Sequence, residues 1–293
     1  MNYSFVAEKD LAVVSPQKPV RVANPLTSEQ GAMRTTLLAG LLRNVGHNLA
    51  RGVRDVKLYE LGRVYLAEPH PRHPSGELAW PVHEPRRLGL VLTGARRAKS
   101  WTGGGDAADY YDLKGSVEDV LEAMGISDSR FQPGPHAALH PASASQLVVA
   151  GQPAGHLGQV HPAAAAHFEV PAETYLAELD WEALLDHSVA LKQLREVPRF
   201  PAVARDLAFV VDTAVLAEKL LEEIHAADER KLLERVTLFD VYRGPPVPEG
   251  RKSVAFGLSL RALDRTLTDS EADALCVAIR DRLKARVGAE IRA

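Results

Sequence analysis

The side chains best suited to contact a ligand lie in a strand-like run near the end of the sequence, KSVAFGLSLR at 252–261. Alternate side chains of a strand point to opposite faces, and one face here is apolar: Val254, Phe256, Leu258 and Leu260. The other face carries Ser253, Ala255, Gly257, Ser259 and Arg261. Such small side chains leave an open floor on which nucleic-acid bases can lie close to the backbone.

A second run, LFDVYRG at 238–244, would supply contacts beside this floor. Alternation places Asp240 and Tyr242 on one face, and Phe239 and Val241 on the other, which suits a core. The Tyr242 ring offers a surface for an unstacked base, worth about 1–3 kcal/mol. The alternative interpretation is that Asp240 only caps the strand and Tyr242 packs at the sheet edge. Four basic side chains are candidates for phosphate contacts: Arg243, Arg251, Lys252 and Arg261.

Two histidine pairs raise the alternative of a metal site. His70 and His73 lie in a proline-rich stretch, and His136 and His140 are bracketed by prolines. Zinc needs three or four ligands held on one helix face or in a knuckle. We therefore expect solvated or core histidines and no metal, although a hydrolase using His136 or His140 would be revealed by stoichiometric metal.

Other catalytic patterns are weak or missing. Asp106, Asp109 and Asp112 form an acidic cluster that could bind a cation but is more typical of a solvated face. No Gly-x-Ser-x-Gly nucleophile motif and no Gly-x-x-x-x-Gly-Lys phosphate loop occurs. The three glycines at 103–105 do not open a helix after a strand, so we interpret them as a flexible turn.

Composition is that of an ordinary globular protein. The chain has 293 residues, of which 46% are hydrophobic and 25% charged, with 35 basic and 38 acidic side chains. At about 150 residues per domain, this predicts two domains. No apolar run approaches the roughly 18 residues of a membrane span, and the single cysteine, Cys276, indicates a reducing cytoplasm and a buried thiol. Because the net charge of the chain is close to zero, any contact with nucleic acid would use a local surface and not a basic domain.

Proline placement suggests the domain boundary. Five prolines between Pro69 and Pro85 predict a long surface loop, and Pro198 and Pro201 separate a first domain, 1–197, from a second, 198–293. In the second domain we predict strands at 205–212, 232–244, 252–262 and 289–293, with helices at 216–227 and 266–288. Thr268 and Glu271 have the spacing of a capping box. The order βαββαβ is the ferredoxin-like plan.

The first domain mixes strands and helices without a βαβ rhythm, which predicts a mainly antiparallel α+β fold. A helix is expected from a cap at Thr27 or Ser28 to Gly52, with Met33 and Leu37 beginning its apolar face. Further predictions are strands at 56–66 and 86–94, a helix at 112–125, a hairpin at 145–160 that turns at 152–154, and a strand with a short helix at 174–185.

Several ordered motifs carry a resemblance to a known family. The second domain resembles the ferredoxin-fold anticodon-binding domain of bacterial phenylalanyl-tRNA synthetase beta subunits, in PRFPAVARDLAFVVD and LFDVYRGPPVPEGRKSVAFGLSLRALDRTLTDSEAD. The first domain is similar to the class II synthetase-like module that precedes it in that family. The motifs are NPLTSEQGAMRTTLLAGLL, LYELGRVY, YYDLKGSVEDVL, LHPASAS and GHLGQVHP.

The resemblance implies a role for the open floor. The anticodon of phenylalanine tRNA begins with guanine, and Asp240, Tyr242 and Ser253 occupy the matching motif positions. A carboxylate such as that of Asp240 can accept the paired N–H donors on the Watson–Crick edge of guanine. Arg243, Arg251, Lys252 and Arg261 would then hold phosphates.

The resemblance also implies a non-catalytic module. A class II synthetase needs one arginine on the ATP α-phosphate and another, in Gly-x-Gly-x-x-x-Arg, on the γ-phosphate. That motif is missing, and Glu60 and Arg63 lie only near where the first pair would be. We therefore expect no catalytic residue, no metal and no cofactor bound by this chain.

The implied setting is a cytoplasmic α2β2 heterotetramer that uses ATP and Mg²⁺ to join phenylalanine to its tRNA. The first domain would be a scaffold for the catalytic alpha subunit. The alternative is a free-standing RNA-binding or structural adaptor without a synthetase partner. Because NYSF after Met1 resembles the interior of a family strand, and the family's editing and magnesium-binding modules have no counterpart, we expect a C-terminal fragment.

Overall fold

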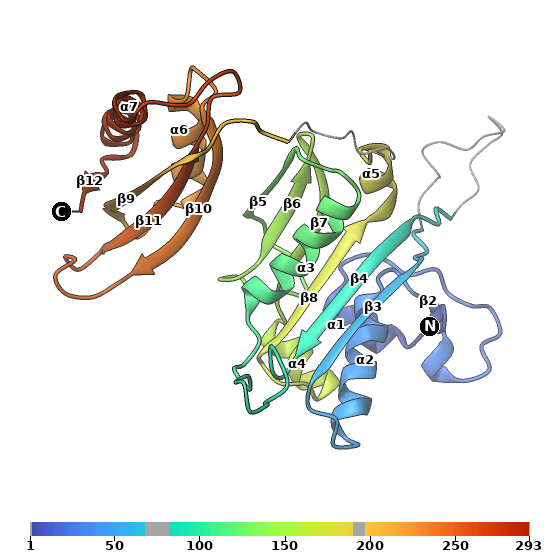
Figure 1. Cartoon of the computed structure of the whole chain (residues 1–293). Coiled ribbons are helices and arrows are strands. Elements are labelled where there is room, and N and C mark those ends of the chain that lie inside the picture. The colour runs from blue at the N-terminus through green and yellow to red at the C-terminus, as the bar shows by residue number, and fades with distance from the viewer. Residues whose placement is uncertain (1, 68–81, 190–196, 293) are drawn as a thin grey trace. The chain divides into compact units, whose positions relative to one another are not determined.

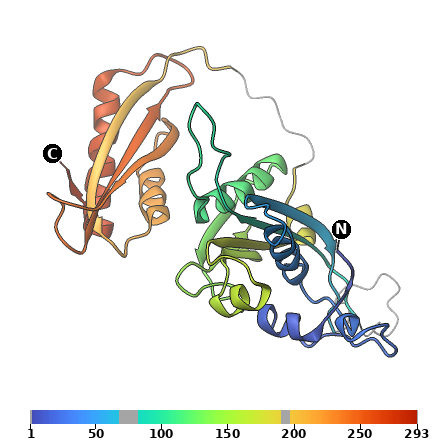
Figure 2. The ribbon, with the colours of Figure 1, turned by 90° about the horizontal axis from the view of Figure 1, so that it is seen from below.

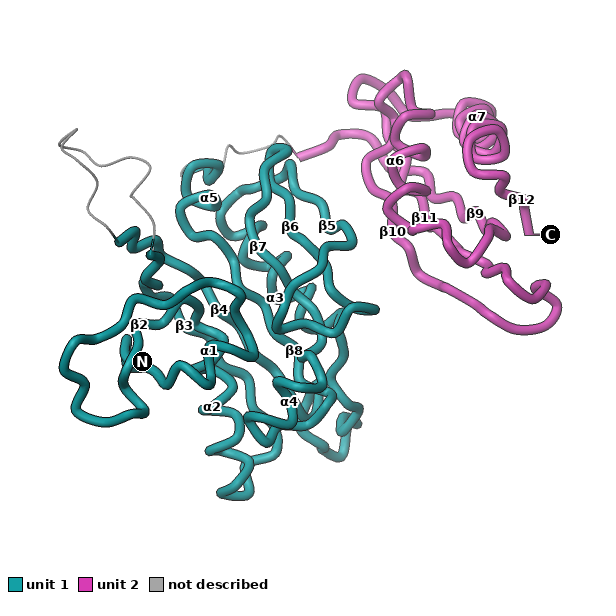
Figure 3. Tube along the Cα trace, turned by 180° about the vertical axis from the view of Figure 1, so that it is seen from behind, with its two compact units in different colours: residues 1–193 teal, residues 194–293 magenta. Residues whose placement is uncertain are grey.

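The computed structural model describes residues 2–67, 82–189 and 197–292. The chain folds into two compact units, residues 1–193 and 194–293 (Figure 3). Among the described residues, no helix is both long and apolar enough to span a bilayer.

Unit 1 is built on a six-stranded antiparallel sheet in the order β3-β4-β8-β7-β6-β5 (Figure 1). Its strands are β3 (Val56–Arg63), β4 (Arg86–Thr93), β5 (Ser129–Pro133), β6 (Ser145–Val149), β7 (Gln152–Gln159) and β8 (Thr174–Asp180). A separate two-stranded ribbon joins β1 (Phe5–Val6) to β2 (Ala32–Met33), with a 3-10 turn at Ser28–Gln30 before β2. The predicted α+β class with antiparallel sheets is confirmed.

Helices bury both faces of this sheet. One core cluster lies under α1 (Glu8–Val14), α2 (Leu38–Leu49) and α4 (Pro162–Phe168). The other lies under α3 (Tyr110–Ala123) and α5 (Trp181–Asp186). In Figure 2, α3 and α4 lie on opposite sides of the strands. The central strands must therefore be apolar in both directions.

Helix α2 packs unusually close to the sheet because β4 has a glycine beneath it. A Cβ atom placed on Gly89 would lie 2.8 Å from Leu41 Cδ1 and 3.1 Å from Leu37 Cβ. The first turn of α2 is held from β8, where the half-buried Glu178 carboxylate accepts hydrogen bonds from the Leu37 amide (2.6 Å) and the Thr36 hydroxyl (2.8 Å). This contact satisfies one backbone N–H group at the helix start, that of the N-cap residue Leu37.

The predicted start of this helix was wrong. It begins at Leu38, and neither Thr27 nor Ser28 caps it. Met33 lies in β2, where its amide donates to the Val20 carbonyl (2.8 Å), and the next amide donates to the Ser4 carbonyl (2.9 Å). Because these amides bond to distant carbonyls, they cannot join a helical i→i−4 ladder.

The turn of the β6–β7 hairpin was also misplaced. The prediction put it at 152–154, but β7 already begins at Gln152 and the turn is Ala150–Gly151. Both turn residues have positive φ, 47° and 77°, as a two-residue primed turn requires. Pro153 is accommodated in β7 beside a register shift in the ladder, where a missing N–H is tolerated.

Unit 2 has the predicted βαββαβ order and is confirmed as ferredoxin-like. Its antiparallel sheet has the order β10-β11-β9-β12. The elements are β9 (Val203–Asp212), α6 (Ala217–Ala227), β10 (Leu233–Tyr242), β11 (Arg251–Leu260), α7 (Asp269–Val287) and β12 (Glu290–Ile291). Thr268 and Glu271 form the expected capping box at the start of α7, and Cys276 is buried.

The two helices of unit 2 cover a single face of its sheet. The core between them contains Phe209, Phe256, Leu258 and Leu260 together with apolar residues of α6 and α7. Val254 is 1% exposed and Phe256 is fully buried, so the predicted apolar face of 252–261 is correct. Within the described part of unit 2, no helix lies on the other face of β9, β10 and β11, and we call it the open face.

Candidate nucleic-acid interface

The open face places Asp240, Tyr242 and Ser253 together. On β10, Asp240 lies opposite Ala255 and Tyr242 lies opposite Ser253. Asp240 and Tyr242 therefore point to the same side, as the alternation predicts. Across the next pair of strands, Ala255 lies opposite Ala208 and Ser253 opposite Val210. The floor beside the tyrosine thus consists of small side chains on β11, flanked on β9 by Ala208 and the larger Val210.

The Tyr242 ring is held in one orientation by the turn that follows it. Its hydroxyl donates to the Pro245 carbonyl (2.9 Å). Gly244 allows this geometry, because a Cβ atom there would lie 2.9 Å from the same hydroxyl oxygen. The ring is 38% exposed. A partly exposed ring fixed in this way can act as a stacking platform for an unpaired base.

Asp240 has an exposed and unengaged carboxylate. Within the part of the chain that the structure describes, no donor forms a hydrogen bond or ion pair with it. It lies two residues from Tyr242 along the same strand face, about 7 Å apart. Its acceptor oxygens are therefore free for a ligand whose flat surface rests on the tyrosine ring. This geometry gives no support to the alternative that Asp240 only caps the strand.

The prediction that Phe239 faces the core was wrong, because β10 contains a bulge. The register shifts between Leu238, opposite Phe256, and Asp240, opposite Ala255, so Phe239 has no counterpart on β11. Phe239 is 57% exposed, not buried, and a Cβ atom on Gly257 would lie 3.7 Å from its ring. The ring thus lies over the glycine on the open face. Val241 does face the helix side, opposite Val254, but is 46% exposed.

Ser253 is not an open part of the floor, because a residue that the sequence did not single out covers it. Arg292, directly after β12, donates from Nη1 to Ser253 Oγ (3.2 Å). The Arg292 guanidinium carbon also lies 5.4 Å from the centre of the Tyr242 ring. Ser253 is only 2% exposed. No local pattern predicts this contact, since it joins residues 39 positions apart.

The four predicted phosphate-binding side chains are in different situations. Arg243 is exposed. Arg251 bonds to Glu290 (2.8 Å) and to the Val210 carbonyl (3.0 Å). Arg261 pairs with Glu234 (3.0 Å), a partner on the neighbouring strand. Both of these lie at the rim of the face with much of their charge compensated.

Lys252 lies on the wrong face for an RNA contact. It is opposite Val211 and on the same side as Val254, which is the helix-covered face. It is 8% exposed, and its ammonium donates to the Thr213 carbonyl (3.0 Å). Burial lowers the pKa of this lysine, with a smaller effect from Arg243. The sequence interpretation overlooked that residues 252 and 253 must point in opposite directions.

In unit 1 the residues that the resemblance puts nearest to an ATP site, Glu60 and Arg63, are already used by the fold. The Glu60 carboxylate is 8% exposed and accepts from Arg34 (2.7 Å) and from Asn2 (2.6 Å). Arg63, three residues further along β3, points to the other side and donates to the Glu84 carbonyl (3.1 Å). These side chains do not converge, so they do not fit a nucleotide phosphate.

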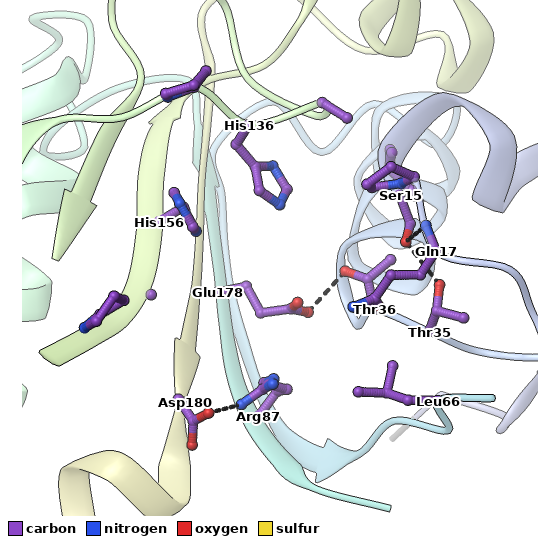
Figure 4. A pocket seen from close by; sticks show the side chains of 16 residues that line it. Ser15, Gln17, Thr35, Thr36, Leu66, Arg87, His136, His156, Glu178 and Asp180 are labelled. Atoms are coloured by element: carbon purple, nitrogen blue, oxygen red, sulfur yellow. Dashed lines mark hydrogen bonds and ion pairs between the residues drawn. The ribbon is translucent and has the colours of Figure 1, made fainter. Parts of the chain in front are cut away.

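A cavity of about 390 Å³ lies on the α2 side of the same sheet (Figure 4). His136 and His156 line one wall with ring centres 5.0 Å apart, and Arg87 pairs with Asp180 at the bottom. Burial raises the pKa of Glu178 in this cavity. Burial, with a smaller effect of His156, lowers the pKa of His136 to about 4. His136 is therefore a neutral histidine. The charged residues beside it already have partners, since Glu178 accepts from Thr36 and Arg87 pairs with Asp180.

The remaining candidate residues from the sequence analysis have structural roles in the part of the chain that the structure describes. Asp109 caps α3 and completes a capping box with Asp112, and Arg96 pairs with both carboxylates. His140 accepts from the Ala142 amide (3.2 Å). No group of three His, Cys, Asp or Glu side chains within the described ranges is arranged to hold a metal ion. His70 and His73 lie outside those ranges.

Comparisons with known proteins agree with the division of the chain into two parts. Residues 1–181 match the family model described as the phenylalanyl tRNA synthetase beta chain CLM domain. Residues 198–292 match the ferredoxin-fold anticodon binding domain.

Individual relatives also match the chain over most or all of its length. The phenylalanine–tRNA ligase beta subunit of Anaeromyxobacter dehalogenans is 42% identical over 296 residues, which cover 100% of this chain and 36% of the relative. That of Symbiobacterium thermophilum is 41% identical over 271 residues, which cover 92% of this chain and 29% of the relative. The chain thus spans about a third of the length of these relatives.

The half-buried His136 of unit 1 gives a pH prediction. His136 stays neutral down to about pH 4 in the folded state, whereas an unfolded histidine takes up a proton near pH 6.5. The unfolded state binds more protons between these values, so stability should fall as pH decreases from about 6.5 to 4, by at most about 3 kcal/mol. His136→Asn keeps an acceptor for the Ala138 amide and should reduce this loss.

The measurement is the thermal unfolding of unit 1 at a series of pH values. His140→Asn is the matched control. His140 accepts the same kind of two-residue hydrogen bond, but no aromatic ring of the described residues packs against it as His156 packs against His136. A loss of stability in acid that is identical in His136→Asn and in the parent chain would contradict the assignment.

Proposed function

The chain belongs to the phenylalanyl-tRNA synthetase beta-chain family, and on that premise we propose that it is the tRNA-reading and scaffolding part of a phenylalanine–tRNA ligase. Unit 2 binds the anticodon of phenylalanine tRNA through its open face. Unit 1 supports the catalytic alpha subunit and performs no chemistry itself. The matched regions cover 36% and 29% of the two relatives, so the proposed role concerns the part of those subunits that this chain matches.

The observation that carries the anticodon role is the pairing of a fixed ring with a free carboxylate on one sheet face. A base that rests on Tyr242 extends its edge along β10 toward Asp240. The Asp240 oxygens can accept the N1–H and N2–H donors of guanine together, whereas adenine has only one donor on that edge. This arrangement supports recognition of guanine at the first anticodon position. Phe239 adds a second ring over Gly257 for a neighbouring base.

The scaffold role is supported by an unpartnered apolar strip at the edge of the unit 1 sheet. Among the described strands, β3 pairs with β4 alone, so its other edge is open. On one face of β3, Tyr59 is 78% exposed and Leu61 is 45% exposed. Both lie on the face that α3 covers further along, opposite Leu90 and Leu88. Exposed apolar side chains beside an open strand edge are typical of a protein interface, and the alpha subunit is the occupant proposed here.

The complete enzyme would be a cytoplasmic α2β2 heterotetramer that uses ATP and Mg²⁺. In this chain Glu60 and Arg63 do not fit ATP, so activation of phenylalanine belongs to the alpha subunit. The competing hypothesis of a free-standing RNA-binding adaptor makes no use of the β3 strip. Co-purification with an alpha subunit separates the two hypotheses.

Replacing Asp240 tests the anticodon role. Asp240→Ala, in the full-length beta subunit assembled with the alpha subunit, should lower kcat/KM for phenylalanine tRNA about 10- to 100-fold, since a two-point base contact contributes about 1–3 kcal/mol. On a tRNA whose first anticodon base is not guanine, the same change should have little effect. Asp206→Ala, on the open face opposite Gly257, is the control. An equal loss on both tRNAs would exclude base recognition by Asp240.

Two basic residues should differ in their effect on salt dependence. Arg243→Ala removes an exposed charge next to Tyr242 and should reduce the slope of log K against log salt for tRNA binding by about one. Lys252→Ala should leave the slope unchanged, because this side chain faces the helices. Filter-binding measurements at salt concentrations from about 50 to 200 mM give the slopes of both variants. A Lys252 effect as large as that of Arg243 would place the RNA elsewhere.

If the strip on β3 contacts the alpha subunit, changing it should weaken assembly of the two subunits. The double replacement of Tyr59 and Leu61 by Ser removes exposed apolar surface and should leave unit 1 folded, yet reduce co-purification of the alpha subunit at least about tenfold, since each buried apolar side chain contributes about 1.5–3 kcal/mol. Tyr111→Ser, on α3 and 74% exposed, is the matched control. An intact complex with the double variant would show that β3 is not the contact.

A further inference from the structure

Arg292 reaches the centre of the open face from the end of the chain. Its amide donates to the Ala208 carbonyl on β9 (2.9 Å), which anchors its backbone at that edge of the sheet. The side chain then crosses β9 to Ser253 on β11 and to Tyr242 on β10. Figure 1 shows β12 and the C-terminal end beside β9. The path is open because Ala208 and Ala255 are the facing pair on these strands.

The Arg292 guanidinium occupies the place that the proposed function gives to a base. It is a flat group with N–H donors, it lies over the tyrosine ring, and it donates to the Ser253 hydroxyl. The Watson–Crick edge of guanine presents a similar planar set of donors. Both cannot hold the same ring face and the same hydroxyl, so the guanidinium has to move when a base binds.

The anchored backbone limits where the side chain can go. The Arg292 amide stays bonded to β9, so the guanidinium can lift off the sheet but cannot leave its vicinity. A base that enters beneath it offers a second aromatic surface, and a guanidinium stacks readily on such surfaces. Arg292 therefore exchanges the tyrosine ring for the outer surface of the base with little loss of contact.

The charge of Arg292 is available for RNA. In the residues that the structure describes, no carboxylate forms an ion pair with it. Glu290, two residues earlier, pairs with Arg251 (2.8 Å), and Glu234 pairs with Arg261 (3.0 Å). The uncompensated cation thus lies at the position nearest to the tyrosine ring.

We propose, on the basis of the anticodon role above, that Arg292 is a further base-binding residue: its guanidinium closes over the base stacked on Tyr242, so that the base lies between ring and guanidinium. The sandwich holds the first anticodon base flat while Asp240 reads its edge. Lifting of Arg292 at the same time frees the Ser253 hydroxyl for that base.

The test is tRNA binding by the full-length beta subunit assembled with the alpha subunit. Arg292→Ala should weaken binding about tenfold, the size expected for one stacking contact, and reduce the salt slope by about one. Arg292→Lys should restore the salt slope but not most of the affinity, because an ammonium is not planar. Arg286→Ala, which removes an exposed arginine on the last turn of α7, is the matched control and should change neither quantity.

Three results would overturn the proposal. Tighter binding by Arg292→Ala would mean that the arginine only competes with the base. Unchanged binding would make it a bystander, and full recovery by Arg292→Lys would reduce it to a phosphate contact. Tyr242→Ala measured in parallel separates this proposal from the anticodon role. If only Tyr242→Ala weakens binding, the sandwich fails and the anticodon role stands; if neither variant does, the anticodon role itself fails.

Discussion

One-sided burial of the unit 2 sheet is the constraint from which its chemistry follows. Helices α6 and α7 cover one face of β9, β10 and β11, and the apolar residues of alternate positions fill the space between them. Since alternate residues of a strand must point the other way, the same packing directs Asp240, Tyr242 and Ser253 to the uncovered side. The stability of the domain thus depends on one face, and the side chains proposed to contact RNA lie on the other.

Local irregularities then shape the open face. The bulge at Phe239 adds one residue to β10, and this turns an aromatic ring from the core side to the open side over Gly257. Gly244 lets the chain pass close enough to Tyr242 for its hydroxyl to bond Pro245. Bulges that redirect a side chain are common beside functional sites, and here the bulge supplies a second aromatic surface.

Unit 1 uses its polar side chains for the opposite purpose. Its sheet is covered on both faces, and charged groups on it have protein partners: Glu60 with Arg34, Glu178 with the start of α2, and Arg87 with Asp180. A buried charge without a partner would cost several kcal/mol, so the buried pair of Glu60 and Arg34 belongs to the fold. The other charges are half-buried and already paired. The contrast with the free carboxylate of Asp240 supports a scaffold in one unit and a ligand-binding surface in the other.

The sequence alone determined the features that depend on neighbours along the chain. Periodicity predicted the βαββαβ order, the capping box at Thr268 and the shared face of Asp240 and Tyr242, since these follow from local geometry. Tertiary structure decided the rest. The start of α2, the bulge at Phe239, the inward direction of Lys252 and the contact of Arg292 with Ser253 depend on which distant strand or carbonyl each group meets. Pairing between remote segments leaves no period in the sequence, because its energy comes from contacts that form only when the chain is folded.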